Sequence, residues 1–327
     1  MVGRRSVWSD ARVIAASASF VPAADEVWRL QQNDDPECRW FRSAVRGAPD
    51  AVAGSMQGTY VLTTDGELLG RINSANPEHV LKMLDGALSK WRSLNRERPR
   101  ATAPIITLPD HRWEDSYPSD GLALERFARD VNGPATDAPS RPVNQDAVWF
   151  AAGELPGFVP SSGNVGAVRD VAPGLIERLT RFAFVDNVRG QTLPFSSKAV
   201  RVAELKSEVT AVNEKVWTLR LWGRTTAETD GSDPGEAYWK SNRAWPRSLS
   251  TNIIGEARWD ATRERFLSFE LVAIGARKGR TTFNGRHREQ NAAPHGIGFF
   301  LKIAPRDHRV APTYINLYGA AWVKMPE

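Results

Sequence analysis

The sequence predicts an α+β protein in which a small N-terminal α/β module is followed by a proline-rich connector and a C-terminal antiparallel β-domain. Three observations predict this order. An Asp-Gly pair between two short apolar runs predicts a β-hairpin in the first third of the chain. Prolines recur through the middle third, where they keep the chain extended. Long segments of alternating apolar and polar residues fill the last third and predict successive strands.

Length and composition agree with this division. The chain has 327 residues, of which 41% are hydrophobic and 25% are charged. At about 100–200 residues per domain, this length predicts two domains. We place the module at 6–95, the connector at 96–195 and the β-domain at 196–327. No apolar run approaches the roughly 18 residues of a membrane-spanning helix, and no secretory signal is visible, so the cytoplasm is the default location.

The N-terminal module opens with a helical segment, residues 8–17, and Phe20–Ala24 then predicts a short strand. Asp35-Pro36 predicts the start of the next helix, because Asp can cap the free amide groups and Pro suits the first helical position. This helix carries Cys38 in its first turn.

A β-hairpin and a further helix complete the module. Gly58–Thr63 and Glu67–Ile72 flank Asp65-Gly66, and an Asp-Gly turn favours a tight hairpin because its central residues need positive φ. Asn76-Pro77 predicts the start of the last helix. Its apolar stripe packs on a sheet and consists of Val80, Leu81, Leu84, Leu88 and Trp91.

The order strand, helix, β-hairpin, helix resembles the C-terminal part of a thioredoxin fold, and residues 59–91 carry most of the resemblance. It implies a thioredoxin-like module over 6–95. The chain contains no Cys-x-x-Cys motif, and Ser55-Met56-Gln57 stands where thioredoxins have a cis-proline. The resemblance therefore implies a scaffold without dithiol–disulfide chemistry.

The connector is extended and carries short helices. Its prolines include Pro99, Pro104, Pro109 and Pro118. Gly121–Val131 predicts a short helix, and Pro173–Phe184 predicts an amphipathic one. Ala147–Phe150 is apolar enough to dock on a core. Because these apolar pieces are scattered, we expect the connector to wrap a neighbouring domain.

The last segment predicts an antiparallel meander, closed as a barrel or folded as a sandwich. In the fourth predicted strand, one apolar face consists of Leu267, Phe269, Leu271 and Ala273. The predicted strands are Ala199–Val209, Val216–Thr226, Thr251–Trp259, Arg265–Gly275, Gly296–Ala304 and Tyr314–Trp322.

Composition excludes several classes of protein. A single cysteine excludes an intrachain disulfide and the usual cysteine-based zinc sites. The chain lacks a dinucleotide fingerprint, a Walker A loop, a GxSxG elbow and an HExxH motif. The formal net charge is +5 and comes mostly from arginine, which suits anion binding where it is clustered. The 12 tryptophans are expected mainly as core anchors, with a few at a binding surface.

Cys38 is the candidate catalytic residue. A thiol in the first turn of a helix is favoured as thiolate by the backbone amides, and Arg39 adds positive charge. Asp35 and Glu37 oppose this effect, and no resolving cysteine is present. A free cysteine is usually a small buried residue, and this structural interpretation is the stronger one.

The densest basic cluster lies in the β-domain and predicts a site for a phosphate or carboxylate ligand. A solvated loop is the alternative. Nothing else in the sequence supports a nucleic-acid partner. His287 and His295 are weak candidates for metal ligands, because a spacing of eight matches no ligand motif and the neighbouring arginines repel a cation. The ligand-binding candidates are Arg277, Arg280, Arg286 and Arg288, with Trp239 and Trp245 on the adjoining loop.

The sequence favours a non-catalytic binding or interaction protein without a cofactor. Its partner is expected to be an unknown protein or a small anionic ligand bound by the β-domain. Two alternatives remain. One is a redox enzyme that uses Cys38 as a lone thiol, and the other is a small-molecule carrier with an apolar β-barrel lumen.

Overall fold

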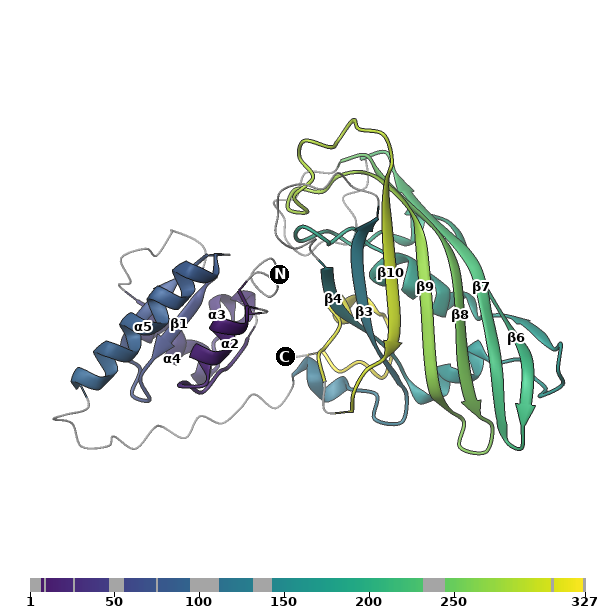
Figure 1. Ribbon diagram of the computed structural model, residues 1–327, viewed down its shortest axis with the longest axis horizontal. Helices are drawn as coiled ribbons and strands as arrows, with labels where there is room; N and C mark the ends of the chain where they lie inside the picture. The colour runs from purple at the N-terminus through teal and green to yellow at the C-terminus, as the bar shows by residue number, and fades with distance from the viewer. Residues whose placement is uncertain are drawn as a thin grey trace. The chain divides into compact units, whose positions relative to one another are not determined.

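The computed structural model consists of two compact units, Met1–Asp110 and His111–Glu327. Figure 1 shows the helices and strands of both units. The structure describes residues 7–8, 10–25, 27–46, 56–74, 76–94, 112–131, 143–231, 245–306 and 309–325.

The first unit begins with helices α2 (Ala11–Ser17), α3 (Val27–Gln32) and α4 (Pro36–Val45). The predicted start of α4 is confirmed, because the Asp35 carboxylate accepts a hydrogen bond from the Cys38 amide at 2.9 Å. The predicted strand Phe20–Ala24 is wrong. Pro22 has no amide hydrogen to donate to a ladder, and the neighbouring Val21 is 97% exposed.

The predicted hairpin and last helix of this unit are confirmed. Strands β1 (Thr59–Leu62) and β2 (Leu68–Ile72) pair antiparallel around a turn in which Gly66 has a φ of 89°. Helix α5 (Pro77–Leu94) packs on this hairpin and on α2. The core of the unit is formed by Val7, Val13, Val61, Leu69, Val80, Leu84 and Ala87.

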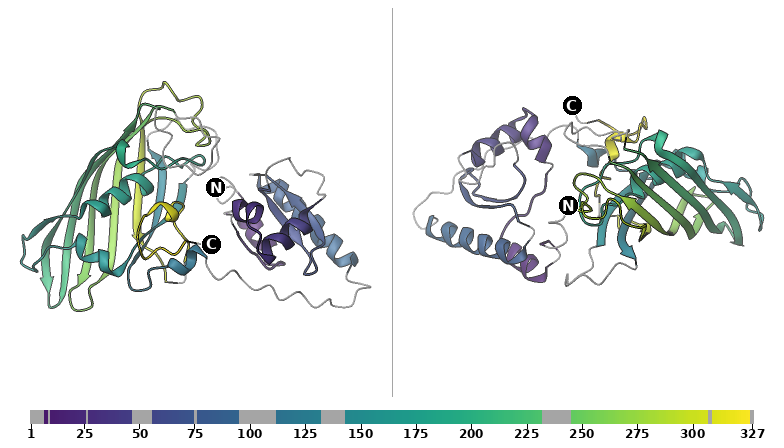
Figure 2. Two further views of the ribbon diagram at one scale, coloured as in Figure 1. Left: turned by 180° about the vertical axis from the view of Figure 1, so that it is seen from behind. Right: turned by 90° about the horizontal axis from the view of Figure 1, so that it is seen from above.

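The second unit is built on one antiparallel sheet of eight strands, in the order β4-β3-β10-β9-β8-β7-β6-β5. The sheet curves along its length (Figures 1 and 2). Its edge strands are β4 and β5. The strands are β3 (Leu122–Val131), β4 (Val143–Phe150), β5 (Val168–Asp170), β6 (Val200–Asn213), β7 (Val216–Thr229), β8 (Arg247–Asp260), β9 (Arg265–Gly279) and β10 (His295–Ile303).

Two predicted secondary-structure elements in this unit are wrong. Gly121–Val131 was expected as a helix, but Leu122–Val131 is strand β3 between β10 and β4. Tyr314–Trp322 was expected as a strand, but it contains only the short helix η5 (Ile315–Leu317) and turns. Gly319 in this segment has a φ of 61°, a backbone conformation that leaves the pleated geometry of a strand.

Helical segments lie on one face of the sheet, which we call the inner face (Figure 2). They are η2 (Ala152–Phe158), α6 (Pro173–Arg178), η3 (Leu179–Ala183) and η4 (Ser197–Ala199). The predicted amphipathic helix Pro173–Phe184 thus corresponds to α6 and η3. The core between these segments and the sheet includes Leu155, Phe158, Ile176, Leu179, Phe184, Leu221, Ile253, Phe269, Leu271 and Phe299.

A bulge on β9 changes which of its side chains face the core. Arg258 pairs with Ser268 and the next residue of β8, Trp259, pairs with Phe266, so Leu267 is the extra residue. Phe266 is therefore buried together with Phe269, whereas Leu267 is 41% exposed. The predicted apolar face of β9 is right for Phe269 and the residues after it, but wrong for Leu267, because an extra residue reverses the alternation.

Candidate functional site

Arg286, a predicted anion-binding residue, is completely buried and bound by carboxylates of its own unit. Its Nη1 and Nη2 donate to Asp130 at 3.0 and 2.6 Å. Its Nε and Nη2 donate to Asp186 at 3.0 and 2.9 Å. An external anion would have to displace both carboxylates to reach this guanidinium.

Arg277 and Arg189 extend the same network. Arg277 is 3% exposed and donates to Glu289 at 2.6 Å. Arg189 donates to Asp130 and to Glu289, each at 3.0 Å. We call these groups the ion-pair network, and its charges balance. Its members are Arg189, Arg277 and Arg286, with Asp130, Asp186 and Glu289.

Electrostatics hold the network in its charged form. Burial acts to raise the pKa of Asp130, but hydrogen bonds and positive charge from the arginines, led by Arg286, outweigh it and hold the pKa below its ordinary value. Burial likewise acts to raise the pKa of Glu289, and Arg277 with its neighbours lowers it further than burial raises it. Burial acts to lower the pKa of Arg286, but Asp130 and Asp186 raise it overall.

The space beside the network is too small for an organic ligand. A cavity lined by Arg277, Arg280 and Asp186 measures about 10 Å³, roughly what one water molecule needs. The guanidinium of Arg280 stacks on the Trp245 ring, with its carbon 3.5 Å from the ring centroid. Arg288 is exposed. Trp239 lies outside the described residues.

The two histidines singled out by the sequence do not meet. His287 is exposed, whereas His295 lies 4.0 Å from Glu289 at the margin of the ion-pair network. The described residues contain no group of three or more His, Cys, Asp or Glu side chains arranged to hold a metal ion.

Cys38, the candidate nucleophile, is fully buried in α4. Its Sγ donates a hydrogen bond to Asp35 Oδ2 at 3.1 Å. The residue that caps the helix therefore also binds the thiol. A substrate could reach the sulfur only after the packing around α4 opens.

The face of the sheet opposite the inner face, which we call the outer face, carries an apolar row across five adjacent strands. Directly opposed residues on neighbouring strands share a face. Ile254 is 67% exposed, and the other members are half-buried. At about 4.8 Å per strand, the row is roughly 19 Å long. In spatial order it consists of Trp222, Ile254, Val272, Phe300 and Phe127.

A row of charged residues lies beside the apolar row on the outer face. On each strand that the two rows share, its member is two residues away from the member of the apolar row. Each end of this row is an ion pair: Arg220 pairs with Glu208 at one end, and Lys302 pairs with Glu125 at the other. Glu256 and Glu270 are directly opposed at its centre, and both are exposed. Neither carboxylate forms an ion pair with another described residue. In spatial order the charged row is Glu208, Arg220, Glu256, Glu270, Lys302 and Glu125.

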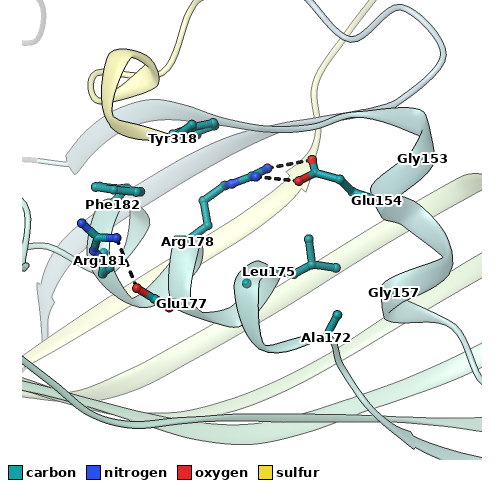
Figure 3. Close-up of a pocket in the computed structure, with 11 residues that line it drawn as sticks. Gly153, Glu154, Gly157, Ala172, Leu175, Glu177, Arg178, Arg181, Phe182 and Tyr318 are labelled. Atoms are coloured by element: carbon teal, nitrogen blue, oxygen red, sulfur yellow. Dashed lines mark hydrogen bonds and ion pairs between the residues drawn. The ribbon is translucent and has the colours of Figure 1, made fainter. Parts of the chain in front are cut away.

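A cavity of about 410 Å³ lies beside α6 on the inner side of the sheet, and we call it the α6 cavity (Figure 3). Figure 3 shows Arg178 reaching from α6 to Glu154 on η2, and Arg181 directed at Glu177. Burial raises the pKa of the Tyr318 phenol well above its ordinary value, so this group stays protonated. The lining residues are Gly153, Glu154, Gly157, Ala172, Gly174, Leu175, Glu177, Arg178, Arg181, Phe182 and Tyr318.

Sequence reasoning identified neither the apolar row nor the α6 cavity. The row is visible in the sequence only as outward-facing apolar residues, such as Ile254 and Val272, on strands whose other face is also apolar. Strands that carry apolar residues on both faces indicate that both faces of the sheet are covered, and this pattern could have predicted the apolar row. The α6 cavity is lined by residues from η2 to the C-terminal region, so no pattern within one segment of the sequence predicts it.

Comparisons with protein-family models, curated proteins and solved structures found no match to this chain. No helix among the described residues is long and apolar enough to cross a membrane.

Proposed function

We propose that this chain is a non-catalytic interaction protein whose second unit binds a protein partner through its outer face. The first unit then serves as a thioredoxin-like scaffold without redox chemistry. The observation that carries the proposal is the apolar row, in which five adjacent strands present apolar side chains at directly opposed, partly exposed positions. Contiguous exposed apolar surface with a polar border marks interaction sites.

The charged row defines the chemistry of the partner. Like charges directly opposed on neighbouring strands are destabilising, and Glu256 and Glu270 are such a pair at the centre of the outer face. A partner that brings a lysine or arginine to this point relieves the repulsion. We therefore commit to a partner segment that carries basic residues beside apolar ones.

A second copy of this chain fits this face poorly. The charged row reads almost the same from either end, as Glu, Arg, Glu, Glu, Lys, Glu. Stacking two copies about a two-fold axis parallel to the strands, between β8 and β9, places Glu256 of one copy on Glu270 of the other. Like charges then face each other, which disfavours self-association.

The anionic-ligand version of the sequence prediction is not carried forward. Arg277 and Arg286 are buried and bound by carboxylates, and the space beside them is about 10 Å³. Cys38 is likewise not proposed as a nucleophile, because it is buried and bound to Asp35.

The test uses the full chain and two synthetic peptides of alternating residues, one of leucine and lysine and one of leucine and glutamate. Fluorescence anisotropy measures their binding at low and high salt. Because the chain carries a formal net charge of +5, non-specific attraction favours the glutamate peptide. We expect the lysine peptide to bind more tightly, and its affinity to fall with salt.

Matched variants locate the binding. Ile254→Asp introduces a charge into the apolar row and should weaken binding at least tenfold, the effect of losing about 1.4 kcal/mol. The control is Ile14→Asp on α2, where the side chain is 56% exposed in the other unit. Equal affinities for these two variants, or tighter binding of the glutamate peptide, would contradict the proposal.

A further inference from the structure

The α6 cavity is independent of the outer face, and it has the dimensions of a small-molecule site. Its volume of about 410 Å³ falls in the range of ligand pockets, roughly 300–1,000 Å³. Leu175 and Phe182 give it apolar surface, and charged side chains of α6, η2 and η3 supply polar groups (Figure 3). The charge of a suitable ligand depends on which of these polar groups it can reach.

Arg178 is turned toward the protein. Its Nη1 donates to the Trp149 carbonyl and to Glu154, each at 2.9 Å, and its Nη2 donates to Glu154 at 2.6 Å. The rings of Phe150 and Tyr318 lie 5.0 and 4.6 Å from its guanidinium carbon. The side chain is 8% exposed. An anionic ligand would have to replace Glu154 to bind it.

Arg181 is also directed at protein acceptors. Its Nε donates to the Phe195 carbonyl at 3.0 Å, and its Nη1 donates to Glu177 at 3.2 Å. The side chain is 11% exposed. Both guanidinium groups that line the cavity therefore already donate hydrogen bonds to oxygen atoms of the protein.

The carboxylates are the accessible groups. The side chain of Glu154 is 25% exposed and that of Glu177 is 38% exposed, several times the exposure of the arginines. Glu177 Oε1 accepts from Arg181 and from Ser197 Oγ, the latter at 2.8 Å. No described residue donates a hydrogen bond to Glu177 Oε2. Because a carboxylate offers about four lone-pair sites, acceptor capacity remains on the accessible side.

We infer that the α6 cavity binds a small organic amine, with the ammonium group donating to Glu177 and the carbon body packed on Leu175 and Phe182. Charge-assisted hydrogen bonds to this accessible carboxylate supply the orientation. The apolar wall supplies the contact area. A carboxylate or phosphate ligand would meet the same accessible oxygens and be repelled.

The test is isothermal titration calorimetry of the full chain with three probes of similar shape: 2-phenylethylamine, 2-phenylethanol and 3-phenylpropanoate. The amine should bind at least tenfold more tightly than the alcohol, and the propanoate should bind least. Equal affinities for the three probes, tightest binding of the propanoate, or no saturable binding of the amine overturns the inference.

Two variants place the amine in the cavity. Glu177→Gln keeps the shape and one acceptor oxygen but removes the charge, and it should weaken amine binding about tenfold. Gly174→Leu adds a side chain at a lining position where a Cβ meets no atom within 4 Å. It should block binding without unfolding the unit. Glu256→Gln on the outer face is the matched control. Unchanged amine affinity in Glu177→Gln or Gly174→Leu would refute the assignment.

Discussion

Arg286→Met tests whether the basic loop is structural or ligand-binding. The substitution removes the guanidinium and keeps a long apolar side chain at a fully buried position. Asp130 then retains Arg189 at 3.0 Å, and Asp186 retains the amide of Asn284 at 3.5 Å. Both carboxylates therefore lose their principal partner while staying largely buried.

The expected cost follows from this geometry. Removing one partner of a buried ion pair costs about 3–5 kcal/mol, because a buried charge is left uncompensated. Arg277 remains 3.4 Å from Asp186 and 3.7 Å from Asp130, which places the expected loss near the lower end, about 3 kcal/mol. At about 2–4 °C per kcal/mol for a domain of about 150–250 residues, the melting temperature of this unit should fall by about 6–12 °C.

Urea unfolding followed by tryptophan fluorescence measures the free energy directly. Arg288→Met is the control, since this arginine is exposed on the same loop and should change stability by no more than about 0.5 kcal/mol. Adding Asp130→Asn and Asp186→Asn to Arg286→Met should recover part of the loss, because neutral amides need no counter-charge. A wild-type unfolding midpoint for Arg286→Met would refute the reasoning and return Arg286 to the candidates for anion binding.

Three further perturbations probe other parts of the chain. Folding lowers the pKa of Asp130 and of Glu289, so the contribution of these two carboxylates to the stability of the folded state is complete above about pH 5. This contribution is lost as the pH falls through the lowered pKa values, and a urea midpoint unchanged down to about pH 3 would contradict it. Native Cys38 should react with iodoacetamide at least tenfold more slowly than in urea, the factor given by about 1.4 kcal/mol of local opening, and equal rates would show an accessible thiol. Gly66→Ala should destabilise the first unit by about 1–2 kcal/mol, because the residue has a φ of 89°, whereas Gly86→Ala in α5 should not destabilise it; equal unfolding midpoints would refute the turn assignment.

Elements with local determinants could be predicted from the sequence. The helix at Asp35-Pro36 depends on a cap and a first residue that are adjacent in the chain. The turn at Asp65-Gly66 depends on a glycine that accepts positive φ. Strand β6 is joined to β7, and β8 to β9, by a short turn, so each of these long strands pairs with a neighbour that is close in the sequence.

Strand β3 shows where local patterns fail. The apolar residues Leu122, Leu124, Phe127 and Val131 are compatible with a helical stripe as well as with a strand. The choice is made by β10, which pairs with β3 along its length and lies more than a hundred residues further along the chain. Strand preference is set by such partners more than by intrinsic propensity. No pattern within the segment could have supplied that information.

The anion site was predicted from a cluster of arginines with two tryptophans on the adjoining loop, and the structure shows why a local cluster of cations does not define a site. The carboxylates that neutralise Arg286 lie 156 and 100 positions away, on β3 and in the segment after η3. The tertiary fold brings a strand residue, Asp130, and two residues outside the strands, Asp186 and Arg286, to one place, so the charge balance is visible only in the folded structure. On the outer face, Glu256 and Glu270 are directly opposed. The cations opposed to them on the other side, Arg220 on β7 and Lys302 on β10, are paired with other carboxylates. In this chain, an interaction site differs from a structural ion-pair network because it has uncompensated charge beside exposed apolar surface. A high density of charge alone does not distinguish the two.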